Sequence, residues 1–175
     1  GAQVFLLILI GMEAGFGEVA AGIGVVYLCR GFGSGFGPLV ARPMMAIPRV
    51  MPYLIGFALM GSGLLYVGVS TFEWGILTLI CIFFSHGCSG VSWVFSTTLL
   101  QRRSDDEWMG RVAGTDNLVI TLTMGVSTIF AGLAMEHEVV TLREMLLITA
   151  GIQISVGMLW LLLASPGERS YLSTT

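Results

Sequence analysis

One arginine stands in the middle of a long apolar stretch, and a run of alternating glycines follows it. The stretch reads GVVYLCRGFGSGFGPLVAR from Gly24 to Arg42. A charge near the middle of a membrane span costs roughly 2.5 to 3.5 kcal/mol on insertion scales, so Arg30 must face a partner or water. Two roles fit this residue. It lines a polar cavity and meets an anionic substrate or a titrating carboxylate, or it pairs structurally with carbonyls or an acid on a neighbouring helix.

The glycines that follow Arg30 do not have the pattern of a phosphate-binding loop. GFGSGFGP lacks the G-x-G-x-x-G spacing, and nothing around it indicates a strand that feeds a helix. Helical spacing instead pairs Gly31 with Gly35, and Gly33 with Gly37, as small-x-x-x-small motifs that let two helix backbones approach closely in lipid. These four glycines are therefore predicted to form a helix-packing surface.

Other polar side chains lie inside apolar segments. His86 can change its charge near neutral pH, as a proton-coupled carrier requires, or stay neutral and bond to a helix carbonyl. Asp116 and Asn117 belong to a polar side of segment 112–135 that should face protein or water. Gln153 is either an interhelical hydrogen-bonding group or a ligand. With Arg30, these residues are the candidates for substrate binding or ion coupling.

The sequence shows no pattern typical of catalysis, a metal site or a cofactor site. Serine is plentiful but lacks a nucleophile elbow, and His86 and His137 are not spaced as a metal pair. Cys29, Cys81 and Cys88 are an odd number, lie inside apolar segments and lack any paired spacing that would hold a metal or indicate a disulfide framework. We expect neither an enzyme nor a bound cofactor.

The composition is that of a membrane protein. Of 175 residues, 55% are hydrophobic and only 11% are charged, and the mean hydropathy is +0.87, whereas soluble domains have about 25% charged residues. A net charge of −3, with eight arginines and no lysine, leaves no basic face for nucleic acid. The surrounding lipid bilayer is the first expected partner.

The apolar segments predict an all-α, polytopic helical bundle in a single transmembrane domain. Each span needs roughly 20 apolar residues. The predicted elements are a partial helix at 1–11, spans at about 21–41, 53–70, 75–100, 112–135 and 142–164, and a polar tail at 165–175. The first segment is too short to cross a bilayer, so we expect it to be the end of a helix in a longer protein.

Arginine and glutamate divide between the two sides of this predicted bundle. Because connections alternate sides, one side receives Arg42, Arg49, Arg102, Arg103, Arg111 and Arg169. The other side receives Glu13, Glu18, Glu73, Glu136, Glu138 and Glu144, together with His137 and Arg143. The positive-inside rule assigns the arginine side to the cytoplasm, with the C-terminal tail inside.

Two motifs carry a resemblance to a known family. The stretch GVVYLCRGFGSGFGPLVAR and the later TTLLQRRSDDEWMGRVAGTDNL resemble the second half of major facilitator superfamily transporters, in the enterobactin-exporter and macrolide-efflux-like branch. The resemblance implies that segment 1–11 ends helix seven and that the five spans are helices eight to twelve. It further implies proton-coupled export of a small hydrophobic or amphipathic molecule across a bacterial-type inner membrane.

The resemblance also marks a loop as a candidate gate. Asp106, Glu107, Gly110 and Arg111 match positions that, in the family, organise a cytoplasmic charge network favouring one conformation, whereas Met109 replaces an arginine of the usual pair. The loop ARPMMAIPR departs further, because it lacks the family's carboxylate. The alternative is a solvated loop with ion pairs worth about 0 to 1 kcal/mol each.

Two kinds of protein partner could pack against this six-helix half. A carrier would need a missing N-terminal half, with the substrate between the halves. Alternatively, the chain is a non-transporting structural or assembly subunit with a transporter-like fold, packed against another membrane subunit. The surroundings of Arg30 distinguish the two, since a water-accessible cavity favours transport and close packing against a second protein favours assembly.

Overall fold

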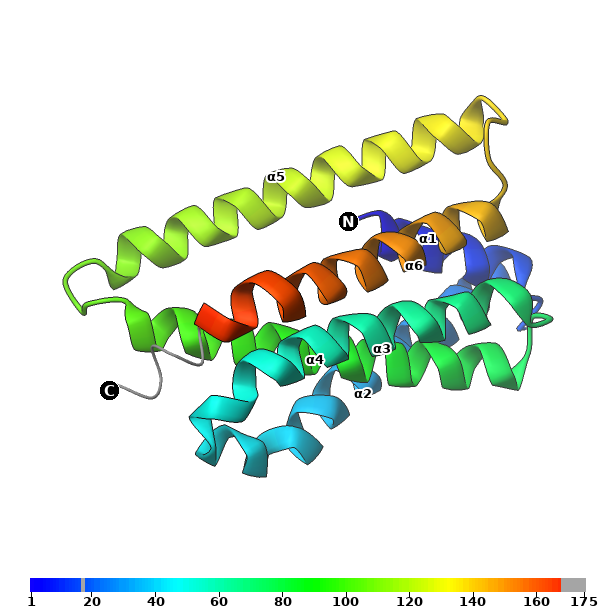
Figure 1. Ribbon diagram of the computed structural model, residues 1–175. Coiled ribbons are helices and arrows are strands. Elements are labelled where there is room, and N and C mark those ends of the chain that lie inside the picture. The colour runs from blue at the N-terminus through cyan, green and yellow to red at the C-terminus, as the bar shows by residue number, and fades with distance from the viewer. Residues whose placement is uncertain (17, 168–175) are drawn as a thin grey trace.

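The computed structural model describes residues 1–16 and 18–167, which fold into six α-helices joined by short connections (Figure 1). The helices are α1 (Ala2–Glu13), α2 (Val19–Ala41), α3 (Met51–Thr71), α4 (Ile76–Arg103), α5 (Met109–Glu136) and α6 (Leu142–Leu159). Two 3₁₀ turns, Arg42–Ala46 and Pro48–Val50, join α2 to α3, and a π-helical turn, Trp160–Ala164, continues α6. No strand occurs in these two ranges, and the predicted all-α class is confirmed.

Five helical segments are long and apolar enough to cross a membrane. They are Val19–Ala46, Pro48–Thr71, Ile76–Arg103, Met109–Glu136 and Leu142–Gly167. Each exceeds the roughly 20 residues that span the hydrocarbon core, whereas α1 has 12 residues. The structure therefore confirms five helices whose length and composition suit a membrane span, as the sequence predicted.

The helices α4 and α5 run past the predicted ends of their apolar segments. Their connection is only 104–108, because the main chain continues to hydrogen-bond through polar residues: Ser104 N–H donates to the Leu100 carbonyl, and Arg111 N–H donates to the Trp108 carbonyl. Apolar composition therefore marks the lipid-buried part of a helix, and the helix itself extends into the polar interface. Of the predicted tail 165–175, residues 168–175 lie outside the described part of the chain.

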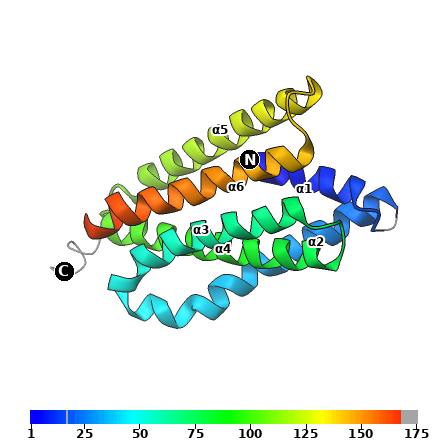
Figure 2. The same ribbon diagram turned by 45° about the vertical axis from the view of Figure 1, so that its right-hand side comes forward.

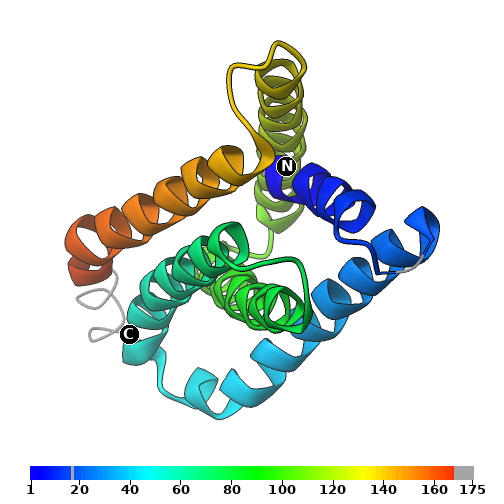
Figure 3. The same ribbon diagram turned by 90° about the vertical axis from the view of Figure 1, so that its right-hand side faces the viewer.

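The helices α3 and α4 lie at the middle of the bundle, flanked by α2 and α6 (Figures 1 and 3). The largest interfaces join α2 to α4, α3 to α4 and α3 to α6, and α1 packs on α2. Helix α5 stands apart from this group, beside α1 (Figures 1 and 2). Only Ala131 is buried along its length, so most of α5 is free to meet lipid or another helix.

The helix contacts have a partial internal symmetry, in which matched interfaces differ in size and the packing of α1 on α2 has no comparable counterpart between α4 and α5. The comparison matches the first three helices with the last three: α1 with α4, α2 with α5, and α3 with α6. Under this matching, the contact of α2 with α4 corresponds to that of α5 with α1. The same matching turns α3 on α4 into α6 on α1, and leaves the pair α3 and α6 unchanged. Since α1 and α4 run in opposite directions along the bundle (Figure 1), the two three-helix units have inverted orientations.

Glycines let α2 and α4 pack backbone to backbone. A Cβ on Gly33 would collide with the Phe83 carbonyl oxygen, and one on Gly37 would collide with the Gly87 carbonyl oxygen. By contrast, a Cβ on Gly31 or Gly35 would meet nothing within 4 Å. The predicted packing surface thus divides in two, with one pair of glycines against α4 and the other pair facing outward.

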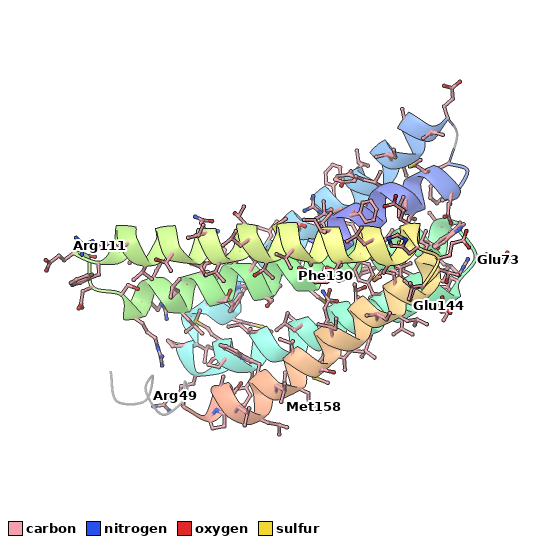
Figure 4. The ribbon with its side chains drawn as sticks, turned by 90° about the horizontal axis from the view of Figure 1, so that it is seen from above. Arg49, Glu73, Arg111, Phe130, Glu144 and Met158 are labelled. Atoms are coloured by element: carbon pink, nitrogen blue, oxygen red, sulfur yellow. The ribbon has the colours of Figure 1, made fainter. Side chains whose placement is uncertain are left out.

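Apart from Arg30 and Asp116, which lie within α2 and α5, the described charged residues lie toward the two ends of the bundle. Arg49 and Arg111 lie at one end, and Glu73 and Glu144 lie at the other (Figure 4). The chain segments that carry Arg42, Arg102 and Arg103, at the ends of α2 and α4, share the first end (Figure 1). The segments that carry Glu13, Glu18, Glu136 and Glu138, at the ends of α1 and α5 and in the adjoining connections, share the second end. Arg169 lies outside the described residues. The bundle therefore has an arginine end and a glutamate end.

Candidate functional site

Arg30 occupies the middle of α2. It is eleven residues from Val19 (30 − 19) and eleven from Ala41 (41 − 30), or about 16 Å from each helix end at about 1.5 Å per residue. The side chain is half-buried, and its guanidinium carbon lies 5.5 Å from the centre of the Tyr27 ring. Its Nε atom is buried without a hydrogen-bond partner. One cationic donor is therefore held at mid-depth with unused bonding capacity.

His86 on α4 and Tyr66 on α3 form a buried polar pair close to Arg30. The Tyr66 hydroxyl lies 3.1 Å from Nε2 of His86, and the two residues are 0% and 6% exposed, respectively. The positive charge of Arg30 acts electrostatically on both side chains. Arg30 therefore lies within electrostatic range of the Tyr66 and His86 pair, and we call these side chains from α2, α3 and α4 the Arg30 cluster.

A fourth helix brings Gln3 to the same level. The α1 and α2 helices run antiparallel, with Gly11 against the main chain of Ile23 and the Tyr27 hydroxyl donating to the Val4 carbonyl at 3.0 Å. Continued toward the first turn of α1, this register places Gln3 at about the level of Arg30 along the two helices. The Nε2 atom of Gln3 is also buried without a partner. The Arg30 cluster therefore has two buried, unused donors.

The helices around the cluster offer almost no acid to neutralise it. Helices α2, α3 and α4 contain no Asp or Glu, and α1 contains only Glu13, its last residue. Asp116 on α5 lines a groove with Ser96 and Leu100 of α4. Ser96 lies ten residues beyond His86 (96 − 86), or about 15 Å along the helix at about 1.5 Å per residue. Asp116 therefore belongs to a separate region near the arginine end.

Asn117 and Gln153 also lie away from Arg30. Asn117 is exposed on the uncovered side of α5. Gln153 packs in the interface between α6 and α3, where its Cβ would lie 3.2 Å from a Cβ added to Gly63, and its Oε1 atom is buried without a partner. Of the five candidate side chains, the structure brings together Arg30 and His86.

The candidate gating loop is open and exposed. Asp106, Glu107 and Gly110 are exposed, and Arg111 places its guanidinium carbon 4.8 Å from the centre of the Trp108 ring. Among the described residues, Arg111 therefore makes its specific contact with an aromatic ring rather than with a loop carboxylate. A cation on an aromatic face is worth about 0.5 to 1 kcal/mol at exposed sites.

A metal or a disulfide is not part of this arrangement. Within residues 1–16 and 18–167, no group of three or more His, Cys, Asp or Glu side chains is placed to hold a metal ion. Cys29, Cys81 and Cys88 are free thiols. The chemistry available in the cluster is hydrogen bonding, charge and proton exchange.

Comparison of the chain with protein-family models, curated proteins and solved structures found no match.

Sequence reasoning did not single out Tyr66, Gln3 or Tyr27 as members of this cluster. Gln3 gave a usable signal, because it is the one amide in the apolar run AQVFLLILI. Tyr66 gave a weaker signal, since a tyrosine inside a span is also an ordinary packing residue. Their relation to Arg30 and His86 depends on the register of neighbouring helices, which one sequence does not specify.

Proposed function

We propose that this chain forms one half of a secondary-active carrier that exports a small hydrophobic or amphipathic molecule in exchange for protons. The observation that carries the proposal is the cluster of Arg30, Tyr66 and His86, contributed by three helices within the apolar part of the bundle. Ionisable residues at this depth are costly and mark substrate or ion pathways in membrane proteins. Secondary transporters bind substrate near the midplane, where their repeated units meet.

The symmetry of the helix contacts supports the same proposal. Inverted repeats of three helices, nested in a six-helix half, are the architecture of major facilitator carriers. The exchange of α1–α3 with α4–α6 relates the contacts of α2 with α4 and of α3 with α4 to weaker ones elsewhere in the bundle, and it does not reproduce the packing of α1 on α2. This partial symmetry adds support to the resemblance in the two sequence motifs.

The uncovered helix faces suit a second lobe. Helix α5 buries a single residue, and the outer side of α2 has an apolar depression lined by Gly31, Gly35, Phe32 and Leu39. Close helix association in lipid depends on small residues at the interface. We propose that the N-terminal half of the carrier covers these faces and that lipid covers the remainder.

In the proposed mechanism, Arg30 recognises the substrate and His86 carries the coupled proton. Protonation of His86 would disturb its bond with Tyr66 and place a second positive charge near Arg30, so the coupled proton would change how strongly Arg30 holds the substrate. The loop containing Asp106, Glu107, Gly110 and Arg111 would gate the cavity from the arginine end. That end faces the cytoplasm of a bacterial-type cell, with the C-terminus inside.

Transport in reconstituted vesicles tests this proposal. The full natural protein, placed in liposomes loaded with a lipophilic fluorescent dye, should export the dye when a pH gradient is imposed and stop when nigericin collapses it. Arg30→Ala should insert normally but lose export, whereas Arg49→Ala, which removes an exposed loop arginine, should export at the normal rate. Normal export by Arg30→Ala would exclude Arg30 as essential, and no gradient-driven export by the natural protein would contradict the carrier proposal.

The open glycine face also supports a second candidate function. Gly31 and Gly35 face outward with no neighbour within 4 Å, as expected if a helix of another subunit packs there. The chain would then be a structural or assembly subunit of a larger membrane complex. Purification from the native membrane in mild detergent separates the two functions. A stable complex with a different membrane protein, together with absence of export, would favour assembly.

A further inference from the structure

Two unused hydrogen-bond donors lie on the facing helices α1 and α2, at a similar level of the bundle. Nε of Arg30 and Nε2 of Gln3 are both buried and have no partner among the described residues. A buried donor left unpaired costs about 1 to 3 kcal/mol, and more when the group is charged. A pair of such donors at one level is therefore a site that lacks its acceptor.

The neighbouring polar groups do not provide that acceptor. Nε2 of His86 is engaged with the Tyr66 hydroxyl, and the Val4 carbonyl accepts the Tyr27 hydroxyl. The surrounding helices α2, α3 and α4 contain no carboxylate, and Glu13 stands at the far end of α1. The acceptor must therefore come from a bound molecule or from a separate segment.

The charge and shape of the site define the acceptor. The guanidinium is planar and donates two parallel hydrogen bonds to a carboxylate, and the amide of Gln3 adds a neutral donor. One positive charge matches a monoanion better than a phosphate dianion. The helices that carry the site are apolar along most of their length, so we expect the rest of the ligand to be hydrophobic.

We propose that Arg30 and Gln3 bind the carboxylate of an amphipathic organic acid, and that such acids are the substrates of the proposed carrier. The claim that these acids are transported rests on the proposed function. The claim that Arg30 and Gln3 bind them can be tested without measuring transport. Arg30 holds the carboxylate by charge and paired hydrogen bonds. Gln3 fixes its orientation from the facing helix.

Binding of matched probes tests this site. The full natural protein is placed in nanodiscs of phosphatidylcholine, and the fluorescence of dansylaminoundecanoic acid is compared with that of its primary alcohol, which has the same chain. We expect the acid to bind at least about tenfold more tightly than the alcohol. Arg30→Gln should remove this preference, Arg30→Lys should keep part of it, and Gln3→Leu should weaken acid binding severalfold. Arg49→Gln, which changes an exposed arginine, should bind like the natural protein.

Three outcomes would overturn the proposal: equal binding of acid and alcohol, an unchanged preference in Arg30→Gln, or no binding of either probe. The comparison of the two probes on the natural protein keeps the test decisive if Arg30→Gln fails to fold. A second set of nanodiscs containing phosphatidylglycerol distinguishes a soluble acid from a lipid headgroup. Loss of acid binding there would assign the anion to the lipid and overturn the substrate class. Export without acid preference would contradict this inference alone, and acid binding without export would contradict the proposed function alone.

Discussion

The hydroxyl of Tyr66 and the Nε2 atom of His86 lie 3.1 Å apart across the interface of α3 and α4. Both residues are buried in the bundle, and a second polar contact, Ser62 with Ser85 at 2.9 Å, lies in the same interface. In lipid, a polar group has no water to bond, so such contacts fix how neighbouring helices meet. This pair therefore sets the register of α3 against α4 and positions His86 near Arg30.

Removing the Tyr66 hydroxyl should weaken the bundle. Tyr66→Phe keeps the ring and its packing but leaves Nε2 of His86 without a partner. Because interhelical hydrogen bonds in membrane proteins average about 0.6 kcal/mol and reach about 1.7 kcal/mol, we expect a loss of this size in the free energy of unfolding. Reversible unfolding in sodium dodecyl sulfate, in a double-mutant cycle with His86→Leu, measures it.

The control for this change is Tyr53→Phe on the same helix. Tyr53 is half-buried, and its replacement tests the loss of a tyrosine hydroxyl away from His86. We expect it to change the free energy of unfolding by less than about 0.5 kcal/mol. Additive effects of Tyr66→Phe and His86→Leu in the cycle would show that the two side chains do not interact.

Two glycines of one helix should respond to alanine with opposite signs. Gly37→Ala drives a methyl group into the carbonyl of Gly87 on α4, and overpacking of this kind costs about 1 to 3 kcal/mol. Gly35→Ala meets nothing within 4 Å and gains up to about 1 kcal/mol from helix propensity. Thermal unfolding in detergent of both variants measures the difference, and equal destabilisation by the two would contradict the observed packing of α2 on α4.

Arg143 should hold the glutamate end of the bundle together. Its Nη1 donates to the carbonyls of Ser70 at 2.6 Å and Phe72 at 2.9 Å, and its guanidinium carbon lies 4.3 Å from the Trp74 ring centre. Arg143→Ala removes these contacts, and we expect faster amide hydrogen exchange in residues 72–76 and a loss of about 1 to 3 kcal/mol in stability. Arg143→Lys should restore only part of this loss, because it lacks the planar guanidinium. Unchanged exchange in residues 72–76 would show that the end is held by other contacts.

The sequence predicted where the helices lie in the chain better than it predicted which side chains of neighbouring helices meet. Apolar runs located all five spans, because hydrophobic length is the main requirement for crossing a bilayer. A charge at mid-span likewise identified Arg30. The partners of Arg30 were not predictable, since they depend on which turn of α1 faces α2 and which turn of α3 faces α4. Gly33 and Gly35 show the same limit, because they share a motif but face opposite environments.

The position of the arginine end across a bilayer tests the central claim most directly. Arg49 and Glu73 are exposed at opposite ends of the bundle (Figure 4), so each is changed to cysteine in a protein whose Cys29, Cys81 and Cys88 are alanine. We expect a membrane-impermeant maleimide to label position 73 in intact cells and position 49 only after permeabilisation. Labelling of both positions from one side, or of position 49 alone in intact cells, would contradict a bundle that spans the membrane with its arginines in the cytoplasm.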